Sequence, residues 1–250
     1  MRYQWNDWRP HFGYNPAHWA INHRHRKPYT TNQNDALNIY LVSLLHKKKL
    51  FCSGLVINNQ TVLTVKSCLL NMPLADIVVQ LSDGSIHKAV SSTDSKDYTM
   101  ESGAYLLSFL HLEKALDETY EKSPPFCLKA VGSKDEVEQW SWDKNKLLPI
   151  KKLVTQVPTS QCNKVISDIN GTLPTSAMSC VENRQITNKC MKTYGLPYLW
   201  KGAFCGMNIF GHNCSSAKNT DVYVRLLREK RLISRTLKLA VAAHLDDIII

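Results

Sequence analysis

The side chains that could carry chemistry in this 250-residue chain are first of all its histidines and cysteines. A histidine beside a serine nucleophile could act as a general base. The candidates in the body of the chain are His46, His87, His111 and His212, and we expect all four at turns or loops. The chain contains no Gly-x-Ser-x-Gly elbow, so none of these histidines lies beside one. The sequence therefore predicts surface histidines without a catalytic role.

The eight cysteines predict disulfides rather than a metal or redox centre. Their number is even and none stands in a Cys-x-x-Cys pair, so we expect no metal and no other cofactor. Glycosylation sequons at Asn59 and Asn170 fit a secreted, extracellular protein. A third sequon, at Asn213, is a weaker acceptor because Cys214 follows it. Residues 1–30 hold no apolar run of the signal-peptide kind, so a signal would have been removed or would lie upstream.

The net charge of the chain indicates what kind of partner it could bind. Lys and Arg together outnumber Asp and Glu, for a formal net charge of +10. Such an excess favours acidic partners: a glycosaminoglycan, an anionic membrane, a nucleic acid or an acidic protein patch. There is no nucleic-acid-binding motif and no Gly-rich phosphate loop, and no stretch approaches the length of a membrane span. The sequence fits both a domain that binds a polyanion and a basic domain that has no specific polyanion ligand.

The elements that must position these side chains are short strands. From about residue 38, short apolar runs alternate with polar turns, which predicts an all-β barrel or sandwich. The runs cover residues 39–45, 55–57, 62–65, 76–81, 104–110, 137–140, 153–157 and 222–226.

The two ends of the chain differ from this body. Residues 1–34 are basic and rich in Trp and His without periodicity, and we expect an irregular tail, either a partner-binding arm or a solvated leader. Within 225–245 the apolar residues fall mostly at helical spacing among Arg and Lys, which predicts a C-terminal amphipathic helix with a basic outer face. We therefore expect the chain to have three parts: an irregular basic tail over 1–34, a folded domain over 35–245 and a C-terminal end over 246–250.

Seven segments, in the correct order, resemble the chymotrypsin/trypsin family of serine proteases. Residues 40–44 and 51–57 resemble the opening strands, and 62–68 (VLTVKSC) resembles the segment that normally reads LTAAHC. The other matches are the strand at 104–107, the linker at 123–128, the strand tryptophan Trp140, the nucleophile loop at 190–197, and the pocket wall at 211–214 with 222–223. The resemblance covers about residues 38–245. It implies two six-stranded antiparallel Greek-key β-barrels with a C-terminal α-helix.

The resemblance also implies that the catalytic triad is replaced. The family uses a serine nucleophile, a histidine base and an aspartate that orients the base. Ser67 stands at the histidine position, Ser102 at the aspartate position and Tyr194 at the serine position. A hydroxyl is no useful base near neutral pH, and a phenol with a pKa near 10 should fill the site of a scissile carbonyl. We therefore predict that the chain is not an enzyme.

Supporting parts of the family's site are changed too. Lys192 replaces a glycine whose N–H helps to form the oxyanion hole, and Thr193 replaces the aspartate that receives the new N-terminus after activation. In the specificity pocket, Asn188 falls at the base and Gly211 on the wall, and Asp221 replaces a small glycine opposite. Asp221 is expected either to bind a Lys or Arg side chain or to block the pocket.

The family's disulfide pattern implies pairs among six of the cysteines: Cys52–Cys68, Cys162–Cys180 and Cys190–Cys214. The bridge between the tryptophan strand and the strand after the nucleophile is missing at both ends, and Trp200 lies where one of its cysteines would be. Cys127 and Cys205 remain, and we expect them to join each other, with another chain as the alternative partner of Cys127.

These features predict a catalytically inactive serine protease homologue, similar to secreted insect proteins of this type. Such a protein would act as a regulator or cofactor in an extracellular protease network, in reproduction or in immunity. Its partners would be an active serine protease, its substrate or its inhibitor, bound through loops around the cleft. The alternative is a polyanion-binding module that uses the basic tail, Lys47, Lys48, Lys49 and the helix face. A hydrolase with rearranged residues is the third hypothesis.

Overall fold

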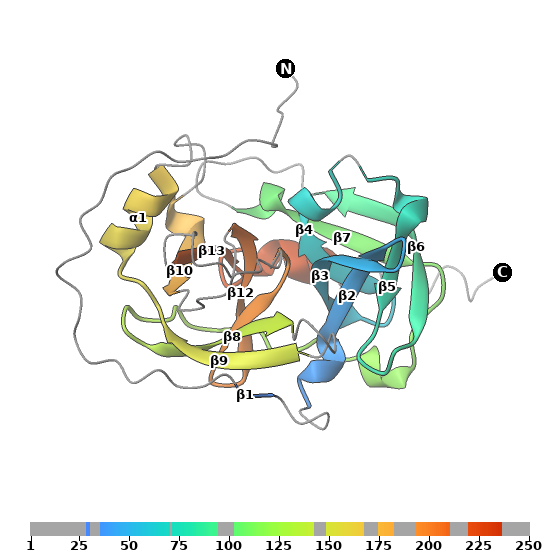
Figure 1. The fold of residues 1–250 in the computed structure, drawn as a ribbon, viewed down its shortest axis with the longest axis horizontal. Coiled ribbons are helices and arrows are strands. Elements are labelled where there is room, and N and C mark those ends of the chain that lie inside the picture. Colours follow the sequence, from blue (N-terminus) through green and yellow to red (C-terminus); the bar gives the residue numbers. More distant parts are fainter. Residues whose placement is uncertain are drawn as a thin grey trace, which may run out of the picture.

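The computed structural model describes residues 29–30, 36–70, 72–94, 103–142, 149–167, 175–182, 194–210 and 220–236. These residues form two antiparallel β units that lie side by side (Figure 1). Short 3₁₀ helices connect the strands, at Asn38–Tyr40, Lys66–Cys68, Leu74–Asp76, Ala104–Leu106, Glu118–Tyr120 and Thr175–Ala177.

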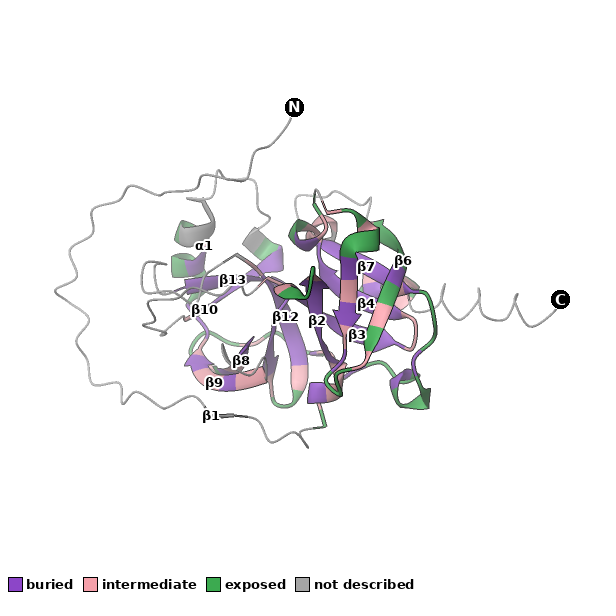
Figure 2. Cartoon of the chain, turned by 45° about the vertical axis from the view of Figure 1, so that its right-hand side comes forward, coloured by how far each residue is buried: buried purple, intermediate pink, exposed green. Residues whose placement is uncertain are grey.

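The N-terminal unit is a closed six-stranded barrel in the order β2-β3-β4-β7-β6-β5. Its strands are β2 (Leu41–His46), β3 (Lys49–Asn58), β4 (Thr61–Val65), β5 (Ile77–Gln80), β6 (Ile86–Asp94) and β7 (Leu107–Leu112). β5 alternates buried and half-buried side chains, as a strand with one face on a core must. β2 and β4 are buried along almost their whole length (Figure 2), and β4 contacts β12 of the second unit.

The C-terminal unit carries its strands in the order β9-β8-β11-β12-β13-β10, and β1 (Tyr29–Thr30) is added at β9. The bounds are β8 (Glu136–Trp142), β9 (Pro149–Thr155), β10 (Met178–Glu182), β11 (Pro197–Trp200), β12 (Ala203–Phe210) and β13 (Thr220–Arg225). A bridge between Gln156, just after β9, and Val181 of β10 brings the two edges together. The sheet is therefore barrel-like, and helix α1 (Thr159–Ser167) packs beside β10.

One hydrophobic core runs through both units. A row of edge-to-face aromatic contacts crosses the boundary: Tyr120 to Tyr40 at 6.4 Å, Tyr40 to Phe204 at 6.4 Å and Phe204 to Trp140 at 6.1 Å between ring centroids. Such pairs add to the stability that area burial alone provides. The two barrels consequently hold each other in a fixed orientation.

The all-β fold with two antiparallel barrels is confirmed, but several boundaries differ from those expected. Tyr29 and Thr30 pair with β9 although they fall within the predicted irregular tail, because an open sheet edge is available to them. Residues 104–106, predicted as strand, form a 3₁₀ turn. In the region 225–245, Arg225 ends β13, residues 226–229 form turns and the described helix covers only 230–236.

Three histidines predicted at turns or loops lie in strands instead, His46 at the end of β2, His87 in β6 and His111 in β7. The imidazole of His111 is hydrogen-bonded to the hydroxyl of Thr93 at 2.9 Å, and burial lowers its pKa from the ordinary value. The two-residue turn begins directly after His46, and His212 lies outside the described residues.

Candidate functional site

The structure describes three of the residues that the sequence places in a site. Tyr194 precedes β11 and is half-buried, Ser67 is exposed in the 3₁₀ helix Lys66–Cys68, and Asp221 is fully buried in β13. The other predicted positions lie outside the described residues: Ser102, Asn188, Lys192, Thr193 and Gly211. The site is therefore built from the elbow at Tyr194, the turn at Ser67 and the β13 side of the pocket.

The elbow at Tyr194 and Gly195 is held by backbone contacts to both barrels. The Ser53 N–H of β3 donates to the Tyr194 carbonyl at 3.0 Å, and the Gly195 N–H donates to the Asn208 carbonyl of β12 at 2.8 Å. Gly195 has a φ of +79°, which only glycine adopts without strain. A Cβ at this position would lie 1.9 Å from the Ser53 carbonyl oxygen. The elbow consequently has one conformation, fixed by glycine and by two neighbouring strands.

Ser53 connects this elbow to β8 as well. Its hydroxyl accepts a hydrogen bond from the Trp142 indole N–H at 2.8 Å, and its carbonyl accepts one from the Thr64 hydroxyl at 2.8 Å. Ser53 is 1% exposed and Trp142 is 8% exposed. A single buried serine thus connects three segments: the elbow, β4 and β8.

The bond between Trp142 and Ser53 can be tested by a double-mutant cycle. We expect Trp142→Phe and Ser53→Ala each to cost about 1–3 kcal/mol of unfolding free energy, because each leaves a buried polar group without its partner. The double variant should cost about 1 kcal/mol less than the sum of the two. Urea unfolding measures all four proteins. Additive losses would mean that the hydrogen bond contributes nothing.

The phenol of Tyr194 packs against the core, and burial raises its pKa above the ordinary value of 10. Near neutral pH the phenol is therefore protonated. The side chain presents a bulky ring and a weakly acidic hydroxyl at the elbow, which is a poor arrangement for nucleophilic attack.

The raised pKa of Tyr194 predicts a loss of stability at alkaline pH. An unfolded tyrosine loses its proton near pH 10, before the folded one does, so the folded state loses stability as the pH rises above 10. We expect the Tyr194→Phe variant to lose less stability than the wild type over that interval. Phenolate absorbance and urea unfolding at stepwise pH measure this. Equal losses in the two proteins would show that Tyr194 ionises as freely in the fold as in the unfolded chain.

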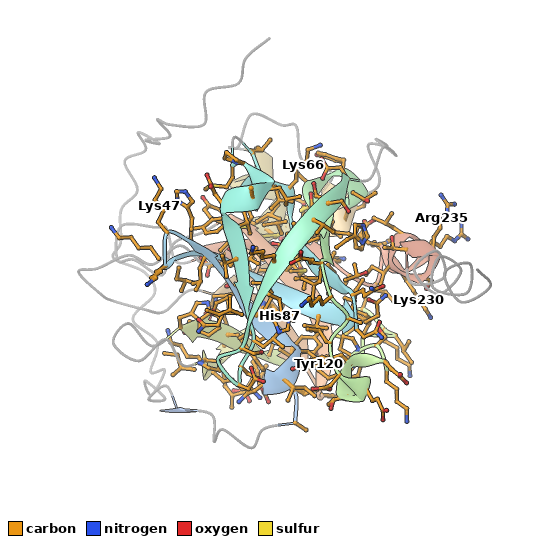
Figure 3. The ribbon with its side chains drawn as sticks, turned by 90° about the vertical axis from the view of Figure 1, so that its right-hand side faces the viewer. Lys47, Lys66, His87, Tyr120, Lys230 and Arg235 are labelled. Carbon is orange, nitrogen blue, oxygen red and sulfur yellow. A yellow bond between two sulfur atoms is a disulfide. The ribbon has the colours of Figure 1, made fainter. Side chains whose placement is uncertain are left out.

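Next to Ser67, Lys66 is engaged in an ion pair. Its ammonium lies 3.0 Å from the Asp94 carboxylate at the end of β6, and the Ser108 hydroxyl of β7 donates to the same carboxylate. Figure 3 shows Lys66 at one end of the N-terminal barrel. This pair anchors the turn that carries Ser67, while the Ser67 side chain itself is exposed to solvent.

Asp221, which the sequence assigns to the specificity pocket, belongs to a buried polar network between β8 and β13. The Gln139 amide of β8 donates to the Asp221 carboxylate at 2.7 Å and lies 3.0 Å from the Tyr223 hydroxyl. Gln139 is 2% exposed, and Asp221 has no exposed surface. Burial, and then the negative charge of Asp221, raise the pKa of Tyr223 well above its ordinary value. The Asp221 carboxylate is thus already satisfied from inside the protein.

Three disulfides join described cysteines: Cys52 to Cys68, Cys162 to Cys180 and Cys127 to Cys205. These are three of the four pairings expected from the sequence, and the fourth, Cys190 with Cys214, lies outside the described residues. Among the residues that the structure describes, no group of three or more His, Cys, Asp and Glu side chains could hold a metal ion. Of the glycosylation sequons, Asn59 lies in the turn between β3 and β4, and Asn170 is not described.

Sequence reasoning missed Gln139, Ser53 and Trp142. Gln139 and Asp221 are 82 residues apart, and Ser53 and Trp142 are 89 apart. No local pattern connects such pairs. One signal was present: a glutamine and an aspartate, each in an apolar strand, should each find a buried partner.

Comparisons with known proteins agree with this architecture. Three similar solved structures are neuropsin from mouse brain (15% identity, TM-score 0.66, covering 84% of this chain and 99% of that one), kallikrein-related peptidase 10 (16%, 0.63, 81% and 97%) and human heparin binding protein (17%, 0.65, 84% and 96%). At such identities the likeness shows the fold alone. The family model described as Trypsin matches residues 29–233, which is most of the chain. With its two barrels and this match, the chain belongs to the trypsin family.

Proposed function

We propose that this trypsin-family chain is not a protease and acts by binding other proteins. The observation that carries the proposal is Tyr194, whose backbone is held at the elbow by Ser53 and which offers a protonated phenol where the family has its nucleophile. Ser67 offers a hydroxyl where the base is expected. Ser102, Lys192 and Thr193 extend the same argument to the orienting acid, the oxyanion hole and the activation latch.

We also propose that Asp221 blocks the specificity pocket rather than binding a Lys or Arg side chain. Its carboxylate has no exposed surface and accepts a hydrogen bond from Gln139. A ligand cation would have to displace that donor and enter a closed, packed region. The pocket therefore contributes no recognition of basic residues in this proposal, and binding falls to the surface around the cleft.

We propose that the protein is secreted and serves as a regulator or cofactor in an extracellular protease network, reproductive or immune, of the kind found for insect homologues. Its partner would be an active serine protease, its substrate or its inhibitor. Three disulfides support an oxidising compartment. Within the described ranges, no helix is long and apolar enough to cross a membrane. A mass shift on enzymatic deglycosylation, lost in the Asn59→Gln and Asn170→Gln variants, would support secretion.

The absence of catalysis is tested with a fluorophosphonate probe, which labels activated serines. We expect no labelling of the wild type under conditions that label trypsin completely. The Tyr194→Ser variant should also remain unlabelled, because Ser67 cannot remove the proton of the new hydroxyl. Stoichiometric labelling of the wild type would overturn the proposal.

Partner binding is tested by affinity capture from the native fluid, followed by mass spectrometry. We expect an active serine protease or a protease inhibitor, recovered reproducibly. A bait with the Ile86→Ser change in β6 (Ile86 is 63% exposed) should capture the same partner, because β6 pairs with neither of the strands that hold the elbow, β3 and β12. Recovery of glycans alone would favour the polyanion alternative. Of the structural neighbours, human heparin binding protein bears such a ligand in its name, and the net charge of +10 would suit the same class of ligand here.

A further inference from the structure

The turn between β2 and β3 consists of two lysines in an unusual backbone conformation. His46 pairs with Lys49 across the hairpin, so Lys47 and Lys48 form a two-residue loop. Their φ angles are +50° and +63°, both in the left-handed region. Such loops strongly favour Asn-Gly, because glycine has no Cβ and asparagine tolerates this region. Lysine has neither advantage, so the backbone of this turn is strained. Replacing Lys47 by Asn and Lys48 by Gly would relieve that strain.

The three lysines of this segment, Lys47, Lys48 and Lys49, are named here the lysine turn. All three are exposed. In the part of the chain that the structure describes, none of them forms an ion pair, whereas Lys66 and Lys151 are paired with Asp94 and Glu138. The one acid recorded near the base of the hairpin, Asp76, lies 3.9 Å from His46. The lysine turn therefore presents three charges to solvent without a counter-charge of their own.

The surroundings of the lysine turn favour a polyanion over a folded protein as the ligand. Protein interfaces depend on buried aromatic, aliphatic or Arg anchors at their centre. The large apolar side chains described as exposed are Leu70, Ile86, Val90 and Leu128, and none belongs to the turn. A chain of closely spaced anionic groups needs no such anchor, since charge alone attracts it.

The lysine turn is also separate from the basic C-terminal helix. Figure 3 places Lys47 on one side of the N-terminal barrel and Lys230 and Arg235 on the opposite side. A short oligosaccharide that contacts the turn therefore does not reach the helix. Retained strain, full exposure and unpaired charge all lead to one assignment: we propose that the lysine turn is a binding site for a sulfated polysaccharide. This site goes beyond the protein-binding function and does not depend on it.

The test uses the full chain and heparin oligosaccharides, with the Lys47→Asn/Lys48→Gly variant. We expect its dissociation constant at 0.1 M salt to rise about 5- to 25-fold, because each lysine near an anionic surface is worth roughly a factor of five. The salt dependence should also become shallower, since fewer counterions are released. The same variant should raise the Tm by about 2–4 °C or more, because the turn loses its strain. If the variant is more stable than the wild type but binds heparin more weakly, the weaker binding cannot come from a damaged fold.

The matched control is Lys134→Asn/Lys201→Asn, which removes the same charge at two other left-handed lysines. It should bind heparin as the wild type does, and the charge-preserving Lys47→Arg/Lys48→Arg variant should as well. Equal weakening in both charge-loss variants would mean that only net charge matters, and no weakening in either would exclude the site. Polyglutamate that competes as well as heparin, through the same two lysines, would reassign the site to an acidic polypeptide. Failure of the wild type to bind heparin would end the proposal.

Discussion

Replacing Gly195 by alanine is expected to cost more than about 4 kcal/mol, enough to prevent the native fold from accumulating. The new Cβ would lie 1.9 Å from the carbonyl oxygen of Ser53, and both partners are backbone. Neither can rotate away, because the Ser53 N–H is bonded to the Tyr194 carbonyl and the Gly195 N–H to the Asn208 carbonyl. The positive φ adds a smaller penalty of about 1–2 kcal/mol. The elbow would have to leave β3 altogether.

Gly202 supplies the matched control for this prediction. Its φ of +74° is close to the +79° of Gly195, but a Cβ there meets no atom within 4 Å. Gly202→Ala should therefore cost only the conformational penalty, about 1–2 kcal/mol. Urea unfolding under non-reducing conditions, with yield of soluble protein as a second readout, compares the two variants. If they are equally stable, the contact between the elbow and Ser53 is not the constraint described above.

Replacing Gln139 by leucine is expected to cost about 3 kcal/mol, the second-largest effect of a single substitution here. The change puts an apolar side chain of similar size into β8 and removes the amide that donates to Asp221. The carboxylate of Asp221 has no exposed surface, so water cannot replace the donor without opening the barrel. A charge that loses a donor in the interior is more costly than a neutral group that does.

A double-mutant cycle shows whether the loss comes from Asp221. In the Asp221→Leu background, Gln139→Leu should cost at least 1 kcal/mol less than it does alone, because the carboxylate is gone. Ser179→Ala, which breaks a neutral contact of 3.1 Å with the Tyr198 hydroxyl in the same region, should cost only about 1 kcal/mol. An equal cost for Gln139→Leu in both backgrounds would assign the loss to packing instead.

The fold could be predicted from the sequence because its information is local and repeated. Runs such as 62–65 are apolar enough to be buried strands wherever the chain folds, and the spacing of Cys52 and Cys68 suits a link between a strand and the turn after its neighbour. β6, β10 and β12 are not among the runs named from the sequence. In β6 the exposed outer face, with Ile86, Lys88 and Val90, lacks a regular alternation of apolar and polar residues. Tyr29 and Thr30 were misassigned because two residues carry too little pattern to mark a strand.

The site was predictable only as a set of positions. Sequence motifs locate Tyr194 and Ser67, because both lie in segments that resemble the family's own. The contacts that define their surroundings, Trp142 to Ser53 and Gln139 to Asp221, depend on how two barrels curl and meet. The left-handed lysines could not be anticipated either, since turn rules predict Asn or Gly at such positions and Lys47 and Lys48 violate them.

The bridge between Cys127 and Cys205 encloses the chain from just after the first barrel to β12, over a sequence separation of 78 residues. Any single cut by a protease between the two cysteines leaves both fragments covalently attached. A nicked molecule would therefore keep its full mass until the disulfide is reduced, and its halves could not diffuse apart. In the proposed role among active proteases, damage to the outer loops of the second barrel would leave its two halves joined.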